Sequence, residues 1–359
     1  MEKSSESKRL VNIETLRVLA MYMVVVSHYI YHGIKVHPAH VSYNITTVCD
    51  FFDYITMEPL YIFSCVSVNC YVMITGYFLV ERTGLRWKAL LKIFTQTLFY
   101  TLIFLLLYYL VEGSICKRQL FEACFPIYNN QYWFITKYFA LILIAPFLSI
   151  IALNVTKRQY CILLLILFAL NFKYLYGSVY AGNGSLMWFC FLYMVAGYIK
   201  LYLGERSGRI VRNKGILLIG TLLFLTAMVS LVNYIKHDFQ LRSSANDEFT
   251  FIMSLVVFVF FIYSHITNRL LIKMTKIAPY TLGVYLLHTN PNLSKILGGG
   301  GGIFCIPETY DMPIILHCIV ICSFIFIAGI LMDYIRGCLF KCFKLNEGIE
   351  VISSKLPQL

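Results

Sequence analysis

The sequence predicts an all-α polytopic membrane protein, a bundle of about ten transmembrane helices. Of its 359 residues, 59% are hydrophobic and only 13% are charged, whereas soluble domains carry about 25% charged residues. The mean hydropathy is +0.72. The apolar residues gather in stretches of roughly 20 residues, the length of an α-helix that crosses a bilayer. These observations together exclude a soluble globular fold.

Ten apolar segments have roughly the length of a membrane span, and short connections join them. The fifth and ninth are the weakest, because the fifth runs into Asn171 and the ninth contains His288 and Asn290. We expect one membrane domain over residues 1–345 and a short cytoplasmic tail over residues 346–359. The expected spans are residues 13–31, 58–80, 92–111, 132–153, 160–176, 186–203, 215–235, 249–267, 277–297 and 313–335.

Lys and Arg residues are concentrated in alternate connections, and such residues mark the cytoplasmic side of a membrane protein. We therefore expect both termini in the cytoplasm, in a multi-pass protein of the cell membrane, with a bacterial plasma membrane as the expected location. The basic residues on the expected inner side are Lys3, Lys8, Arg9, Arg82, Arg86, Lys88, Lys92, Lys157, Arg158, Arg206, Arg209, Arg212, Lys214, Arg269, Lys273, Lys276, Arg336, Lys341, Lys344 and Lys355.

The formal net charge of +12 follows from this asymmetry. The basic residues are spread over short loops that meet anionic lipid headgroups, so membrane lipids are expected partners. No stretch combines a dense basic patch with exposed aromatic residues for base stacking, so nucleic acid is not expected.

The first segment carries ionisable residues that are unfavourable inside a bilayer. Glu14 and Arg17 lie near one end and His28 near the other, and each costs about 2.5–3.5 kcal/mol at the centre of a span. Arg17 and His28 are about three turns apart, so both leave the same face, roughly 16 Å from each other along the axis. Glu14 precedes Arg17 by about one turn, where the two can form an ion pair. The alternative is that Arg17 reaches toward the membrane surface and His28 is a hydrogen-bonded core residue.

The stretch ETLRVLAMYMVVVSH, residues 14–28, resembles the first span of the integral-membrane acyltransferase 3 family, in which ten residues separate an Arg from a His. The family usually has Asp where this chain has Glu14, a change that keeps the carboxylate. Some relatives carry an appended soluble esterase-like domain, which we do not expect here. Further stretches that look like the family are VMITGYFL at 72–79, YWFITKYFALILIAPFL at 132–148 and GVYLLHTNP at 283–291.

The resemblance implies an O-acyltransferase that moves an acyl group, usually acetyl, from acyl-coenzyme A to a carbohydrate hydroxyl. Such a transfer needs a base for the hydroxyl proton, and His28 suits this role because imidazole titrates near neutrality. Arg17 lies too far from His28 to touch the same atom. It fits a contact to the donor or a structural partnership with Glu14, and we place Glu14, Arg17 and His28 in the catalytic group. No bound metal is expected, because no Cys or His spacing is typical of a metal site.

The resemblance also implies a cytoplasmic acetyl-coenzyme A donor, used as a substrate and not as a permanently bound cofactor. The expected inner connection ERTGLRWKALLK, residues 81–92, offers basic side chains for it. We expect Arg82, Arg86 and Lys88 to contact the donor phosphates, since a guanidinium binds two phosphate oxygens at once. Family members often have a closer basic pair here, so the match is loose. The alternative is that these residues only set the orientation of the chain.

The carbohydrate acceptor is expected at the outer side. Trp133 lies near the outer boundary of its span, where Trp is common as an interface anchor; lining a sugar-binding mouth is the functional alternative. His288 and Asn290 lie in LLHTNP within a weak span, and we expect them to be polar contacts to the acceptor.

Two other interpretations of the chain stay open. The competing class is a secondary transporter, a glycan flippase or a subunit of an export complex, because these are also helical bundles with intramembrane charges. A transporter usually has repeated halves with broken helices, and no internal repeat is visible here. Cys116 and Cys124 share one outer loop, so they can form a disulfide in an oxidising compartment.

The basic asymmetry makes the topology testable. Reporter fusions near residues 120, 180, 240 and 305 are expected to report the outside, and fusions near residues 85 and 210 the cytoplasm, because the inner connections carry the Lys and Arg residues. An outside report from residues 85 and 210 would reverse the predicted orientation.

Overall fold

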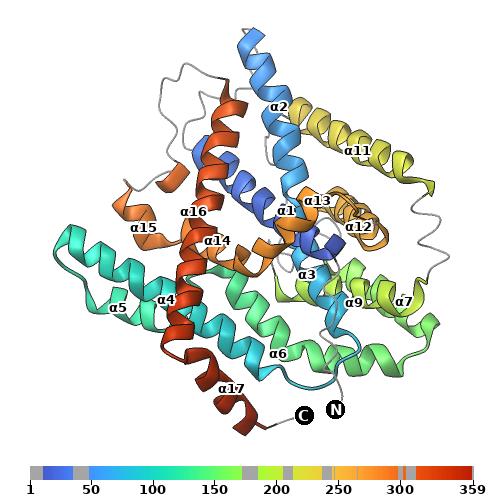
Figure 1. Ribbon diagram of the computed structural model, residues 1–359. Helices are drawn as coiled ribbons and strands as arrows, with labels where there is room; N and C mark the ends of the chain where they lie inside the picture. The colour runs from blue at the N-terminus through green and yellow to red at the C-terminus, as the bar shows by residue number, and fades with distance from the viewer. Residues whose placement is uncertain are drawn as a thin grey trace.

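A computed structural model describes residues 11–34, 48–171, 185–204, 213–236, 245, 247–264, 266–297, 302–304 and 313–357. The regular elements in these residues are helices, and they form one bundle (Figure 1). The main helices are α1 (Val11–His28), α2 (Val48–Ser64), α3 (Val66–Leu79), α4 (Trp87–Glu112), α6 (Trp133–Asn154), α7 (Lys157–Asn171), α9 (Leu186–Tyr202), α11 (Gly215–Lys236), α12 (Glu248–Tyr263), α14 (Thr281–His288) and α16 (Ile314–Cys342). The shorter elements are η1 (Tyr29–Ile34), α5 (Lys117–Cys124), α13 (Arg269–Met274), η4 (Thr275–Tyr280), α15 (Pro291–Ile296), η5 (Gly302–Phe304) and α17 (Leu345–Lys355).

The predicted class, a polytopic helical membrane bundle, is confirmed. Within the described residues, 7 helical stretches are long and apolar enough to cross a membrane, and α9 and α12 are shorter apolar helices. Each of the ten predicted segments contains a helix in the structure. The orientation of the termini and the division at residue 345 stay predictions.

Two predicted segments are broken where one span was expected. The segment predicted at 58–80 is the pair α2 and α3, which meet at Cys65, and α2 begins at Val48. Asp53 and Glu58 interrupt the apolar pattern of α2, so hydropathy did not indicate the first turns of this helix. The segment predicted at 277–297 divides into η4, α14 and α15, because Pro279 lies inside η4 and a new helix is capped by Asn290.

The predicted C-terminal tail contains a helix, α17, which packs against α4. The indole Nε1 of Trp87 donates to the carbonyl oxygen of Pro357 at 2.6 Å, and Lys88 forms an ion pair with Glu350. This ion pair holds the pKa of the Glu350 carboxyl below its usual range. α17 therefore lies beside the connection between α3 and α4.

The disulfide that the sequence allowed is absent from the structure, in which Cys116 and Cys124 are both free thiols. Cys116 instead caps α5, where its Sγ accepts a hydrogen bond from the backbone N–H of Gln119 at 3.4 Å.

Close backbone contacts hold two pairs of helices together. A Cβ on Gly76 of α3 would lie 2.5 Å from the carbonyl oxygen of Tyr193 in α9. A Cβ on Gly329 of α16 would lie 2.5 Å from the Cα of Val284 in α14. Without a hydrophobic drive between helices in lipid, small residues allow the tight packing that associates them. These contacts hold α3 against α9 and α14 against α16.

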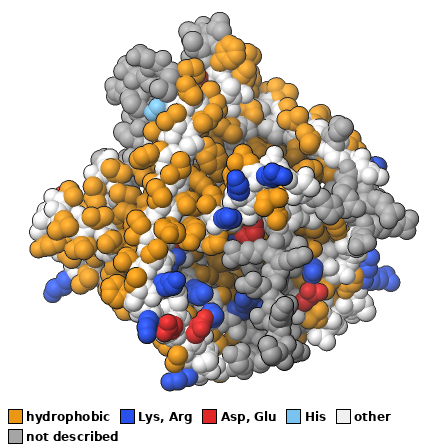
Figure 2. Space-filling model, viewed as in Figure 1, with side chains coloured by type: hydrophobic (Ala, Val, Ile, Leu, Met, Phe, Trp, Pro, Cys, Tyr) orange, Lys and Arg blue, Asp and Glu red, His pale blue; other side chains and the backbone are white. Residues whose placement is uncertain are grey.

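The outer face of α16 is apolar. Figure 2 shows hydrophobic side chains along this helix, with Lys and Arg side chains gathered near α17 and α13. This pattern matches a helix that faces lipid along its length and reaches a headgroup region at its C-terminal end. The exposed large apolar residues of α16 are Leu316, Ile319, Val320, Phe324, Ile327, Leu331, Tyr334, Ile335 and Leu339.

Substitution of Gly76 tests the contact of α3 with α9. Gly76→Ala is expected to lower the stability of the protein by about 1–3 kcal/mol, because an added methyl group in a full interface forces the backbones apart. Thermal unfolding in detergent measures the change. Gly220→Ala in α11 is the control, since a Cβ there meets nothing within 4 Å. Equal unfolding midpoints for the two variants would contradict the close packing.

Candidate functional site

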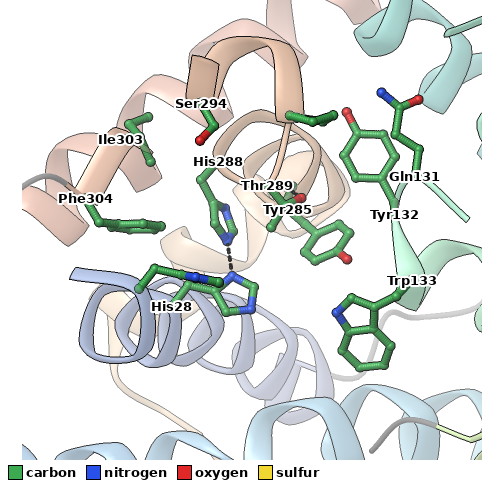
Figure 3. A pocket seen from close by; sticks show the side chains of 12 residues that line it. His28, Gln131, Tyr132, Trp133, Tyr285, His288, Thr289, Ser294, Ile303 and Phe304 are labelled. Atoms are coloured by element: carbon green, nitrogen blue, oxygen red, sulfur yellow. Dashed lines mark hydrogen bonds between the residues drawn. The ribbon is translucent and has the colours of Figure 1, made fainter. Parts of the chain in front are cut away.

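A cavity of ≈ 260 Å³ lies where α1 and η1 meet α14, α15, η5 and the start of α6. Figure 3 shows its side chains converging from these elements. Aromatic rings and imidazoles form most of the wall, and no Asp or Glu of the described chain lines it. The lining residues are His28, His32, Gln131, Tyr132, Trp133, Tyr285, His288, Thr289, Pro291, Ser294, Ile303 and Phe304.

The end of α1 brings two histidines to this cavity. The α-helix ends at His28 and continues without a break as the π-helix η1, an element that is rare and frequent at functional sites. His32 lies about one turn after His28, and the centroids of their rings are 5.5 Å apart. Both side chains therefore reach the same cavity from one continuous helix.

His28 and His288 contact each other directly. Nδ1 of His28 lies 2.9 Å from Nε2 of His288, and Nδ1 of His288 lies 2.6 Å from the carbonyl oxygen of Val284. His288 is 6% exposed. The second ring nitrogen of His28 points away from His288, toward the side of the cavity that Trp133 forms (Figure 3). One nitrogen of His28 is thus occupied by the protein, and the other faces the cavity.

The start of α6 supplies the opposite wall with Tyr132 and Trp133. The hydroxyl of Tyr132 donates to the carbonyl oxygen of Leu286 at 3.2 Å and accepts from Nδ2 of Asn290 at 2.6 Å. Oδ1 of Asn290 accepts from the backbone N–H groups of Asn292 and Leu293. Asn290 does not line the cavity. Its observed contacts cap α15 and tie α15 to α6, so its predicted contact with the acceptor stays a prediction.

The basic connection between α3 and α4 forms a second cavity, of ≈ 440 Å³. Arg82, Arg86 and Lys88, predicted to contact the donor, all line it, together with Ser353 of α17. Arg86 is half-buried, and its burial and the neighbouring charge of Arg82 lower the pKa of its guanidinium. Two cations held this close together favour an anionic ligand between them.

The two cavities lie toward opposite ends of α16. Beside the first cavity, the hydroxyl of Tyr29 bonds Nδ1 of His317, near the start of α16, at 2.7 Å. Beside the second, Ser353 belongs to α17, which follows the end of α16. α16 has 29 residues, which correspond to about 43 Å of helix. The two cavities therefore adjoin opposite ends of a helix that is long enough to cross a bilayer.

The expected ion pair of Glu14 and Arg17 is present. Nη1 of Arg17 lies 2.8 Å from both carboxylate oxygens of Glu14, and Glu14 is 7% exposed. The hydroxyl of Tyr71 donates to the carbonyl oxygen of Arg17 at 2.9 Å. Neither Glu14 nor Arg17 lines either cavity, so the structure does not bring them to His28.

Several residues of the site were not predicted from the sequence. His32 follows His28 by one turn, a spacing that the sequence contains, but the predicted span ended before it. Tyr132 and Tyr285 have no sequence signal of their own, because tyrosines are common throughout this chain. Within the described residues, no group of three or more His, Cys, Asp or Glu side chains suits a metal ion.

Comparison with known proteins agrees with the membrane fold. Residues 10–333 match a family described as an acyltransferase domain. No curated protein and no solved structure matches the chain significantly.

Proposed function

Since the chain belongs to the acyltransferase 3 family and is a membrane acyltransferase, we propose that it transfers an acyl group from coenzyme A to a carbohydrate hydroxyl. Acetyl is the proposed acyl group, and the acceptor is a cell-surface or lipid-linked sugar. The observation that carries the proposal is the free nitrogen of His28, which faces a cavity lined by aromatic and polar side chains.

His28 is the general base of the proposed reaction. Its Nε2 takes the proton of the acceptor hydroxyl while the hydroxyl oxygen attacks the carbonyl carbon of the thioester. The new carbon–oxygen bond forms, the carbon–sulfur bond breaks, and the leaving thiolate takes the proton from the imidazolium. The proton is thus returned to the leaving group, and the reaction needs no further reactant.

The cavity beside His28 is the proposed acceptor site. Its volume of ≈ 260 Å³ is close to the lower limit of small-molecule pockets, about 300 Å³, so it suits one sugar unit better than an oligosaccharide. Trp133 offers a flat apolar face, while Gln131, Thr289 and Ser294 offer hydrogen bonds. This combination of aromatic walls and a few polar groups is typical of a specific ligand site.

The basic cavity is the proposed site for the phosphates of the donor. Coenzyme A carries its thioester at the end of a long pantetheine arm, so the phosphates and the reacting carbon need not share a cavity. Lys88 is already paired with Glu350, which leaves Arg82 and Arg86 as the stronger candidates. Arg82 is exposed and Arg86 is half-buried, and both lie on the side that we propose is cytoplasmic.

The donor site is tested by the double substitution Arg82→Ala/Arg86→Ala. The affinity for acetyl-coenzyme A is expected to fall, because each lost charge-assisted contact removes about 1.5–3 kcal/mol of binding free energy. Calorimetric titration of the purified protein in detergent measures the affinity. Lys157→Ala/Arg158→Ala removes the same charge at another predicted inner connection and serves as the control. Equal donor affinities in both double variants would leave Arg82 and Arg86 as determinants of orientation only.

Substitution of His28 tests the proposed base. His28→Gln keeps the size and polarity of the side chain but cannot accept a proton at neutral pH, so transfer is expected to fall about 10²–10⁴-fold. Donor affinity should be retained, because the basic cavity is untouched. The measurement is acyl transfer, or thioester hydrolysis where no acceptor is supplied. His317→Asn is the control: it changes another intramembrane histidine but keeps a polar atom for Tyr29. Near-normal transfer by His28→Gln would exclude His28 as the base.

A further inference from the structure

We propose that His288 is a positioning residue that fixes the tautomer and the ring orientation of His28. This inference rests on the proposed role of His28 as the base. His288 does not act on the substrate in this account; it acts through the hydrogen bond between the two imidazoles, which joins Nδ1 of His28 to Nε2 of His288 at 2.9 Å.

The proton positions follow from the chemistry of the atoms in contact. The carbonyl oxygen of Val284 can only accept a hydrogen bond, so Nδ1 of His288, 2.6 Å away, must carry a proton. A neutral imidazole has one N–H group, and its other nitrogen is an acceptor. Nε2 of His288 is therefore the acceptor, and Nδ1 of His28 is the donor. This leaves the proton-accepting lone pair of His28 on Nε2.

Close packing of α14 against α16 fixes the backbone that positions His288. Val284 and His288 are one turn apart in α14, and the Cα of Val284 is pressed against Gly329 of α16, where a Cβ would come within 2.5 Å. The next residue toward the start of α14, Gly283, is packed as closely against Asp333. The carbonyl oxygen at the end of the hydrogen-bond chain is thus fixed by the contact of α14 with α16.

The hydrogen bonds from Val284 through His288 to His28 orient the base for the proposed reaction. Figure 3 shows the second nitrogen of His28 turned toward the space in front of Trp133. When this nitrogen takes the acceptor proton, Nδ1–H of His28 remains bonded to His288, which stabilises the imidazolium by a charge-assisted hydrogen bond. Without His288, the ring of His28 can rotate, and its proton can move to Nε2, which would block the base.

Other titratable groups also face the pair, and none of them replaces this hydrogen bond. His32 of η1 lies beside His28 with ring centroids 5.5 Å apart. Tyr285 of α14 lies 5.9 Å from His288 between ring centroids. Tyr132 of α6 lines the same cavity but bonds Leu286 and Asn290.

Two substitutions that place an amide at different ring positions separate this role from a direct contact with the acceptor. In His288→Gln the terminal amide falls where Nε2 lies, so its oxygen can still accept from His28. In His288→Asn the amide falls where Nδ1 lies, so it reaches Val284 but not His28. We expect kcat to fall at least about 10-fold in His288→Asn, with most of it regained in His288→Gln, because only the glutamine keeps an acceptor for Nδ1 of His28. The donor KM should be the same in both.

Equal losses in the two variants, or a change confined to the acceptor KM, would overturn the positioning role. A double substitution adds a second test, since His288→Asn should cause no further loss in a His28→Gln background. A further loss of the same size would show that His288 acts independently of His28. Full activity of His28→Gln itself would instead refute the proposed base, so the two failures are distinguishable.

A spectroscopic measurement does not depend on activity or on the folding of the His288 variants. In protein labelled with ¹⁵N-histidine, the signals that His28→Gln removes belong to His28. The wild-type protein at neutral pH is expected to show a His28 ring protonated at Nδ1 and not at Nε2. A ring protonated at Nε2 would overturn the inference even if the His288 variants fail to fold. In folded His288→Asn, the population of the Nε2-protonated form should rise.

Discussion

The contact of α14 with α16 is the constraint on which the rest of the site depends. Gly283 and Gly329 let the two helices approach until an added Cβ would overlap Asp333 or Val284. The same contact buries Asp333, whose carboxylate accepts from Arg336, Gln96 and Tyr100. One helix pair thus fixes α4 through a polar cluster and fixes the Val284 carbonyl that orients His288. The position of His28 follows from this arrangement.

Two ion pairs within the spans each join residues of a single helix. Glu14 with Arg17, and Asp333 with Arg336, are both three residues apart, a spacing at which helical side chains meet. Pairing lowers the cost of an ion in a low-dielectric environment, although it does not remove that cost. Each pair also receives a tyrosine contact from another helix, from Tyr71 to the Arg17 carbonyl and from Tyr100 to Asp333. These contacts join neighbouring helices where lipid offers no alternative partner.

The sequence predicted the helical class and the positions of most spans, because hydropathy is a local signal. It also singled out Trp133 and His288, which both line the cavity beside His28. It did not predict that His288 would touch His28, since that contact joins residues 260 positions apart. Asp333 lies inside the span predicted at 313–335, but the sequence did not indicate its role, because its partners Gln96 and Tyr100 come from the distant helix α4. The sequence did not predict helix α17, because its apolar residues are too few for a membrane span. Their role is visible only in the structure, where α17 packs against α4.

The membrane setting gives a physical reason for a histidine at position 288. A carboxylate there would orient His28 equally well, but it would bring a permanent charge into a buried site that no Lys or Arg of the described chain lines. An unpaired charge in such a site is strongly unfavourable. An imidazole that donates to a backbone carbonyl supplies the same acceptor without any net charge. In the proposed reaction, the site then becomes charged only when His28 takes the acceptor proton, and the leaving thiolate removes that proton again. A neutral partner therefore suits a base that must act among apolar helices.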